Sequence, residues 1–241
     1  TATGTSVFAS LDISGDIDVD GTTNLDVVDV DGAVNFAADV TFADGADIIT
    51  ASAGTSNFRA GVNAGNSIAS GGNYNTLIGD EAGTALTTGD DNVAIGFEAL
   101  KTEDEHGRNV AVGYQSLKTL NAGALAVTTT VGYKSGTSLT TGVQNVLIGG
   151  LSGDALTDAD FNVAVGNNTL TTDTKGNKST AIGYEALTTQ NFSTSTDSFN
   201  TAVGFQSGAS VTTGVKNTLI GSLAGDAITN GDNNVALGHS A

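Results

Sequence analysis

A glycine recurs at a nearly fixed spacing from residue 75 to the end of the chain, and this repeat constrains the fold more than any other feature. Each glycine closes a short apolar run such as Asn92-Val93-Ala94-Ile95-Gly96, and seven of the nine intervals between successive glycines are 17 residues long. Paired helices and propeller blades need longer units. A unit this short, with one β-branched run, predicts an all-β stack of coils, a β-solenoid or β-roll. The ten anchor glycines are Gly79, Gly96, Gly113, Gly132, Gly149, Gly166, Gly183, Gly204, Gly221 and Gly238.

Composition excludes several classes of protein. The 241 residues carry a formal net charge of −18 and no basic patch, so we expect no nucleic-acid partner, because Lys and Arg supply most of that affinity. Cysteine is absent, which removes disulfides, a thiolate nucleophile and cysteine metal sites. No apolar stretch approaches the roughly 20 residues that cross a bilayer, so we expect no membrane insertion. Because the sequence begins at Thr1 without methionine, we expect a piece of a longer polypeptide.

The chain divides into three zones. Residues 1–50 hold ten aspartates and no Lys or Arg, and their alternation of polar and apolar residues predicts an acidic shaft of short strands. Residues 51–74 are rich in Ala, Ser, Gly and Asn, and we interpret them as a transition segment. Residues 75–241 form the repeat domain of ten rungs, one for each anchor glycine.

The columns of the repeat predict which side chains face inward. The residue before each anchor is always aliphatic, so we expect it to point into the coil, together with the Val or Thr three before the anchor. The residue two before the anchor is apolar in nine of ten rungs and should then form an outer stripe that another chain covers. The alternative is that this column lines the interior. Asn stands four before the anchor in eight rungs and is expected to bridge neighbouring rungs.

A longer period of four rungs is also visible. A second apolar segment, expected to be a second strand, follows each anchor late, after an extra glycine (79–86), or early (96–100). The order late, early, early, late recurs from Gly149, so four rungs make one module. The two long intervals fall in the third rung of each module and insert residues 122–128 and 191–198 on the same side. Such loops are the usual recognition elements of a solenoid, and the candidate contacts are Asn191, Phe192 and Phe199.

The Asn-Val-Ala-Ile-Gly motif, present at 92–96 and with Val for Ile at 109–113 and 162–166, resembles the head repeats of YadA-type trimeric autotransporter adhesins and related repeats of bacteriophage tail fibres. The acidic stretch 14–25 resembles shaft sequences of tail fibres from marine phages. The first resemblance implies a left-handed parallel β-roll assembled as an elongated homotrimer. The period of this chain is longer than in most adhesin heads.

The resemblance favours a non-enzymatic tail-fibre protein of the virion, either shaft or receptor-facing region. Its expected partners are copies of itself, other fibre or tail proteins, and a bacterial surface receptor, either a glycan or an outer-membrane component. The alternatives are a surface adhesin of the autotransporter type, an ice-binding protein presenting its threonine rows, and a polysaccharide-acting β-solenoid. No cofactor is expected.

Few residues carry a chemical signature. Asp16, Asp18 and Asp20 followed by Gly21 match the opening of a Ca²⁺ loop, but the twelfth position is Val27, so the set is only a weak metal candidate beside the interpretation as a solvated acidic face. His106 and His239 are expected at the surface. The run 103–105 is interpreted as a solubilising turn. The aromatic residues that directly follow five anchors are expected to stack at a corner of the coil.

Overall fold

The computed structural model describes residues 34 and 50–241, and the strands in this part are three residues long or shorter. They are β1 (Phe58–Ala60), β2 (Thr76–Ile78), β3 (Val93–Ile95), β4 (Val110–Val112), β5 (Thr129–Val131), β6 (Val146–Ile148), β7 (Val163–Val165), β8 (Gly176–Asn177), β9 (Thr180–Ile182), β10 (Thr196–Asp197), β11 (Thr201–Val203), β12 (Thr218–Ile220) and β13 (Val235–Leu237). The described residues contain no helix.

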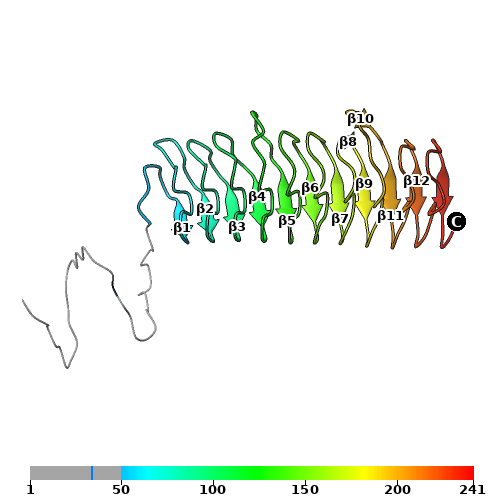
Figure 1. The fold of residues 1–241 in the computed structure, drawn as a ribbon, viewed down its shortest axis with the longest axis horizontal. Coiled ribbons are helices and arrows are strands. Elements are labelled where there is room, and N and C mark those ends of the chain that lie inside the picture. Colours follow the sequence, from blue (N-terminus) through cyan, green and yellow to red (C-terminus); the bar gives the residue numbers. More distant parts are fainter. Residues whose placement is uncertain (1–33, 35–49) are drawn as a thin grey trace, which may run out of the picture. The chain divides into compact units, whose positions relative to one another are not determined.

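Eleven of these strands form one parallel sheet in which each strand pairs with the strand one rung further along the chain (Figure 1). The register never slips, so that each residue lies beside its counterpart in the next rung, as Val93 does beside Val110. The prediction of a parallel β-solenoid with rungs of about 17 residues is confirmed. The strands β8 and β10 make a separate parallel pair at the edge of the coil.

The sheet begins earlier than the ten anchors predict. Strand β1 lies inside the segment 51–74 and pairs in register with β2, and Gly61 closes it as an eleventh anchor. The sequence pattern misses this rung because Arg59 occupies a position that is uncharged in every other strand of the large sheet, and its guanidinium reaches carbonyl oxygens of Ala64 and Ala51. The acidic zone 1–50 lies outside the described residues apart from Val34 and Thr50.

The predicted orientation of the repeat columns is wrong. The middle residue of each strand from β2 to β12 in the large sheet is completely buried, whereas the residues before and after it are half-buried or exposed. The alternative that this column lines the interior is therefore the one the structure shows. The physical reason is space: a coil of 17 residues has a narrow interior, which fits alanine, while the β-branched side chains pack side by side on the outer surface of the sheet.

Glycine and leucine alternate inside the coil so that the interior volume stays constant. In the first rung of each module the strand contributes Leu77 or Leu147, and the fourth residue after the anchor is Gly83 or Gly153. A Cβ atom on Gly83 would lie 2.8 Å from Leu77 Cδ2. In the early rungs the strand contributes alanine, and a buried leucine takes the place of that glycine. The four-rung module therefore reflects packing inside the coil. Rungs whose second apolar segment comes late occur as neighbouring pairs, and the glycines of each pair leave room for one strand leucine.

The expected second strand of each rung is not formed. The leucines of that segment, such as Leu86 and Leu100, are fully buried and fill the coil, but the backbone around them is turn. Most neighbouring threonines use their hydroxyl groups to bridge rungs. Thr87 Oγ1, for example, donates to Asp104 O at 3.1 Å, and Thr102 Oγ1 donates to Lys118 O at 2.7 Å.

The asparagine column bridges the rungs as predicted. Asn75 Oδ1 accepts from the backbone N of Asn92 at 2.9 Å, and Asn75 Nδ2 donates to the carbonyl oxygen of Gly89 at 2.8 Å. The same two contacts recur at Asn162 and Asn217. Each side chain therefore satisfies one donor of the next rung and one acceptor of a turn, both of which are buried.

The anchor glycines are required by close approach as well as by backbone angle. A Cβ atom on any of the ten anchors from Gly61 to Gly221 would lie 2.2–2.6 Å from the carbonyl oxygen of the next anchor. Their φ angles lie between 125° and 144°, a region that L side chains rarely adopt. The recurring glycine is thus what allows the rungs to stack at the spacing of a parallel sheet.

Candidate functional site

The outer sheet face, formed by the side chains one and three residues before each anchor, is a regular surface that runs along the whole eleven-stranded sheet. From β2 to β13 it consists only of Val, Ile, Leu and Thr. Val131, Ile148, Ile182 and Ile220 each expose 37–39% of their surface. In a protein with a net charge of −18, an uncharged face of this length is unusual, and a contiguous apolar patch marks an interaction surface.

The aromatic residues after the anchors form two stacked columns, as predicted. The ring centroids of Phe97 and Tyr114 are 5.3 Å apart, and those of Tyr114 and Tyr133 are 5.4 Å apart. Tyr184 and Phe205 form the second column at 5.5 Å. Because each ring covers the face of its neighbour, these columns contribute to the stacking of rungs, and mainly ring edges meet solvent.

Two loops interrupt the array: loop 1 (residues 122–128), between β4 and β5, and loop 2 (residues 191–198), which contains β10. Both project from the same edge of the solenoid, at the top of Figure 1. They lie four rungs apart, which corresponds to about 19 Å at the spacing of parallel strands. The structure therefore presents two protrusions on one side, as the intervals in the sequence indicate.

The three candidate contacts, Asn191 and Phe192 in loop 2 and Phe199 directly after it, differ in their placement. Asn191 is exposed, although its Oδ1 accepts from Thr174 Oγ1 at 3.2 Å. Phe199 exposes 49% of its surface, and Lys178 Nζ lies 5.3 Å from the centre of its ring. Phe192 exposes only 6% and packs against Gly176, so its ring holds the loop to the coil and is closed to a large partner.

A buried carboxylate lies beneath loop 2. Asp173 is completely buried and accepts hydrogen bonds from the backbone N of Gly176 at 3.0 Å, of Lys175 at 3.3 Å and of Phe192 at 3.2 Å. Its other oxygen accepts from Gln190 Nε2 at 2.6 Å. Four donors from two rungs thus meet one carboxylate, which satisfies an anion that has lost its water.

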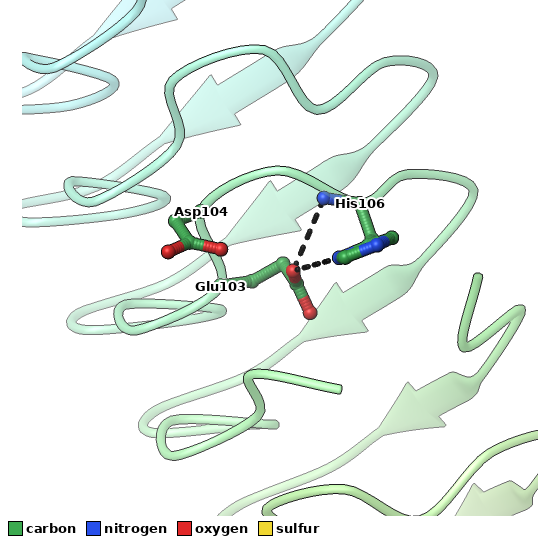
Figure 2. A group of neighbouring side chains, drawn as sticks. All are labelled: Glu103, Asp104 and His106. Carbon is green, nitrogen blue, oxygen red and sulfur yellow. Dashed lines mark hydrogen bonds and ion pairs between the residues drawn. The ribbon is translucent and has the colours of Figure 1, made fainter. Parts of the chain in front are cut away.

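A second buried carboxylate, Glu103, lies at the equivalent place beneath loop 1 (Figure 2). Its oxygens accept from the backbone N of His106 at 3.2 Å and of Ala122 at 3.4 Å. Burial raises the pKa of the Glu103 carboxyl, and these two hydrogen bonds only partly oppose the rise. The interpretation of residues 103–105 as a solubilising turn is therefore wrong for Glu103, because its side chain turns inward, whereas Glu105 is exposed.

The surroundings of Glu103 are incompletely satisfied. His106 Nδ1 lies 3.5 Å from Glu103 Oε1 without a hydrogen bond, and Asn109 Nδ2 has none either. These are the two buried side-chain polar atoms of residues 50–241 that lack a partner. His106, which was expected at the surface, is partly buried. The region below loop 1 is therefore polar, enclosed and short of hydrogen bonds.

Glu103, Asp104 and His106 each offer one ligand atom, and these atoms lie within 4.8 Å of one another. Figure 2 shows Asp104 on the far side of the backbone from the Glu103–His106 pair. Glu103 is already engaged by two backbone donors, so the group is better described as a carboxylate–imidazole pair, and we assign no metal to it. The weak Ca²⁺ candidate Asp16, Asp18 and Asp20 lies outside the described residues.

A second charged group lies on the surface of module 1. Glu98 lies between Lys101 Nζ at 2.7 Å and Lys118 Nζ at 2.6 Å, and Gln115 Nε2 donates to it at 2.7 Å. These contacts, led by the hydrogen bond from Lys101, lower the pKa of Glu98 to about 2. Lys101 also contacts Glu81, so four charged side chains link three rungs. This network stabilises the stack.

Comparison with known proteins gives no functional lead. The chain matches no protein-family model, and the searches of curated proteins and of solved structures return no significant match. Within the part of the chain that the structure describes, no helix has the length and apolar character needed to cross a bilayer. The function must therefore be argued from the surfaces of the solenoid.

Proposed function

We propose that this chain is a structural, non-enzymatic fibre protein that assembles as a homotrimer through its outer sheet face. The observation that carries the proposal is the uncharged, β-branched composition of that face over the whole length of the sheet. Eleven strands in perfect register make a flat surface on which side chains of identical copies can interdigitate. Burying half-exposed Val and Ile side chains yields about 25 cal/mol for each Å² removed from water.

The composition of the chain supports association of this kind. An elongated array exposes every rung, and a net charge of −18 distributed elsewhere on the surface keeps an assembled rod soluble. The outer sheet face contains no carboxylate to repel a second copy. The number three and the left-handed coil come from the resemblance to YadA-type heads and tail-fibre repeats, and they are part of the proposal.

The same resemblance supports the further proposal that the protein is part of a phage tail fibre, where it would extend from the virion and attach to a bacterial surface. In this proposal loops 1 and 2 are the receptor contacts, together with the exposed candidates Asn191, in loop 2, and Phe199, directly after it. Three copies of each loop on one rigid rod would multiply weak contacts with a repeated glycan or outer-membrane component through effective concentration. Other fibre or tail proteins would hold its ends.

One alternative loses support. Ice binding needs threonine hydroxyls that are free to order water, but Thr102, Thr119, Thr172 and Thr189 donate to carbonyl oxygens of neighbouring rungs. A bacterial surface adhesin of the same architecture would use the same surfaces, and it differs from a fibre in what the chain is attached to. Labelling of intact phage particles with an antibody against this chain would separate the two.

The assembly is tested by the mass of the purified chain in solution. Light scattering after size exclusion should give about 72 kDa, three times the 23.9 kDa of one chain. A charge placed on the outer sheet face, Ile148→Lys, should shift the mass toward a single chain, because a lysine buried in an apolar contact is costly.

The matched control is Thr141→Lys, an exposed position of the same rung outside the sheet, which should keep the wild-type mass. A wild-type mass of 24 kDa at micromolar concentration would overturn the assembly. An Ile148→Lys variant that remains fully trimeric would show that the outer sheet face is not the contact.

A further inference from the structure

We propose that the buried carboxylates Glu103 and Asp173 are latches that hold the two loops on the solenoid, and that they differ in strength: Asp173 closes loop 2 firmly, whereas Glu103 leaves loop 1 free to open. The proposal concerns the conformational freedom of the loops. It stands whether or not the loops contact a receptor and whether or not the chain is a trimer.

The two carboxylates occupy the same place in the module. Each is the seventh residue after the second anchor, Gly96 or Gly166, and each is fully buried. Each accepts from the backbone N of the residue at the start of its loop, Ala122 or Phe192. Because a buried carboxylate must find donors, both rungs fold their loop onto it.

The latch of loop 2 is complete. Gln190 connects Asp173 to the rest of the loop base, because its Nε2 also donates to Ser179 Oγ at 2.9 Å and its Oε1 accepts from Asn200 Nδ2 at 2.8 Å. Ser179 Oγ in turn lies 2.5 Å from the hydroxyl of Ser198, the last residue of the loop. Both ends of loop 2 are thereby tied to one network, and the pairing of β8 with β10 holds its middle.

The latch of loop 1 lacks most of these contacts. Leu120 occupies the position that Gln190 has in module 2, so that position offers Glu103 no side-chain amide. His106 stands where module 2 has Gly176, and it brings an unpaired Nδ1 into the site. A Cβ atom on Gly176 would lie 2.1 Å from Asp173 Oδ2 and 2.8 Å from the Phe192 ring, so a side chain there prevents such a tight closure.

The exposed tips agree with this difference. In loop 1, Leu125 and Val127 expose 50% and 46% of their surface, and the tip is apolar. In loop 2 the aromatic residue, Phe192, is buried, and the exposed residues are polar. Local opening of loop 1 exposes only small apolar side chains, chiefly the buried Ala126, whereas in loop 2 it must expose a phenylalanine and break a buried hydrogen-bond network.

Hydrogen exchange at single-residue resolution on the purified full chain tests the proposal. The amides of Ala122 and Phe192 are equivalent probes, since both donate to the latch carboxylate. After correction for intrinsic rates, Ala122 should exchange at least about tenfold faster than Phe192 at pH 7. Rates for the two amides within threefold of each other would overturn the proposal.

Variants test whether the buried carboxylates cause the difference in exchange between the two loops. Asp173→Asn places an amide donor against Gln190 Nε2 and should speed exchange of Phe192 at least tenfold, while Glu103→Gln should change exchange of Ala122 less than threefold. The controls are Asp80→Asn and Glu105→Gln, which remove exposed carboxylates and should change neither rate.

Should Asp173→Asn fail to fold, Gln190→Leu provides the second variant, because it introduces the residue that module 1 carries at that position. It should also speed exchange of Phe192 at least tenfold, with the anchor-glycine amides of the sheet unchanged. Unaltered exchange of Phe192 in a folded Asp173→Asn or Gln190→Leu chain would contradict the role of the latch.

Discussion

Loops 1 and 2 leave the solenoid at the same point of the module, yet the structure ties them down in different ways. Loop 2 has a buried aromatic ring, a carboxylate with four donors and a short pair of strands at its base. Loop 1 has a carboxylate with two long hydrogen bonds and one unpaired ring nitrogen, His106 Nδ1, beside it. Two loops at equivalent positions of a repeat therefore need not be equally stable, because the inserted residues determine how many contacts each loop makes with the coil.

The difference bears on recognition. A rigid loop binds with little loss of conformational entropy and suits a partner of fixed shape, whereas an adaptable loop loses more entropy but accommodates variation. A rod that carries one loop of each kind on the same edge combines both properties. The predictions below compare the loops directly, and all free energies refer to one fixed protein concentration, since assembly contributes to apparent stability.

The largest difference is expected from removing one apolar side chain from each loop. Phe192→Ala empties a buried aromatic site and should cost about 3 kcal/mol of the free energy of unfolding, in the range for phenylalanine in a core. Leu125→Ala removes a half-exposed side chain and should change it by less than about 0.5 kcal/mol. Urea unfolding followed by circular dichroism measures both. Similar losses would show that the two loops are packed alike.

A smaller contrast is expected from the asparagine column. Asn162→Ser removes two good contacts, to the backbone N of Ser179 at 2.9 Å and to the carbonyl oxygen of Gly176 at 2.8 Å, and should cost about 2 kcal/mol. Asn109→Ser, below loop 1, loses only the bond from the Thr128 backbone N at 3.1 Å, because Asn109 Nδ2 is unpaired, and should cost less than about 1 kcal/mol.

The same urea experiment measures both variants. Serine is a suitable replacement because it occurs naturally in this column, at position 179. An Asn109→Ser variant that is as unstable as Asn162→Ser would mean that Asn109 Nδ2 has a partner after all, such as a bound water molecule.

The fold was largely accessible from the sequence, because rung stacking imposes a rule on every repeat. Glycine at each anchor and, in most rungs, asparagine four residues earlier are required by backbone contacts between neighbouring rungs, so their spacing alone predicts a solenoid. The orientation of the strands was not accessible. Both alternating columns are apolar, and only the narrow interior, visible in three dimensions, assigns Ala94 to the inside and Ile95 to the outside.

The buried carboxylates were missed for a related reason. Glu103 is part of an acidic run, and the residue type alone indicates solvent. The available signal was its column: an acid also stands seven residues after the equivalent anchor in module 2, although that neighbourhood is otherwise different. The first rung was missed for the same reason. Arg59 interrupts the apolar sequence pattern, although the backbone of β1 pairs with β2 like every other strand of the sheet.

Changing pH should loosen loop 1 through Glu103. Its folded pKa is raised above the unfolded value of 4.5, so the stability that the protonated carboxyl contributes is fully present below pH 4.5 and is lost as pH rises through the folded pKa. His106 and Asp104 are the titratable neighbours. Corrected exchange of Ala122 should therefore become faster as pH rises from 4.5 to 8.

The Glu103→Gln variant should abolish this dependence. Glu98 acts in the opposite direction and in another window: its lowered pKa contributes stability above pH 4.5 that is lost as pH falls toward 2, so it leaves the interval from 4.5 to 8 unaffected. Exchange of Ala122 that slows with rising pH, after correction, would contradict the assigned direction.

The smallest effect is expected from the ion pair on the surface of loop 2. Lys178 Nζ contacts Asp197 Oδ2 at 2.6 Å, and this contact with the loop lowers the pKa of Asp197. Both side chains are partly exposed, so Lys178→Gln should lower the stability only slightly and should speed exchange of loop 2 about twofold in low salt. The equivalent residue of module 1, Arg108, lies 3.9 Å from Asp91 outside the loop, and Arg108→Gln should leave loop 1 unchanged.

Addition of 1 M salt should remove the effect of Lys178→Gln, because screening weakens an exposed pair but leaves a buried latch intact. If exchange of loop 2 is accelerated as much by Lys178→Gln as by Asp173→Asn, the surface ion pair, and not the buried carboxylate, holds the loop.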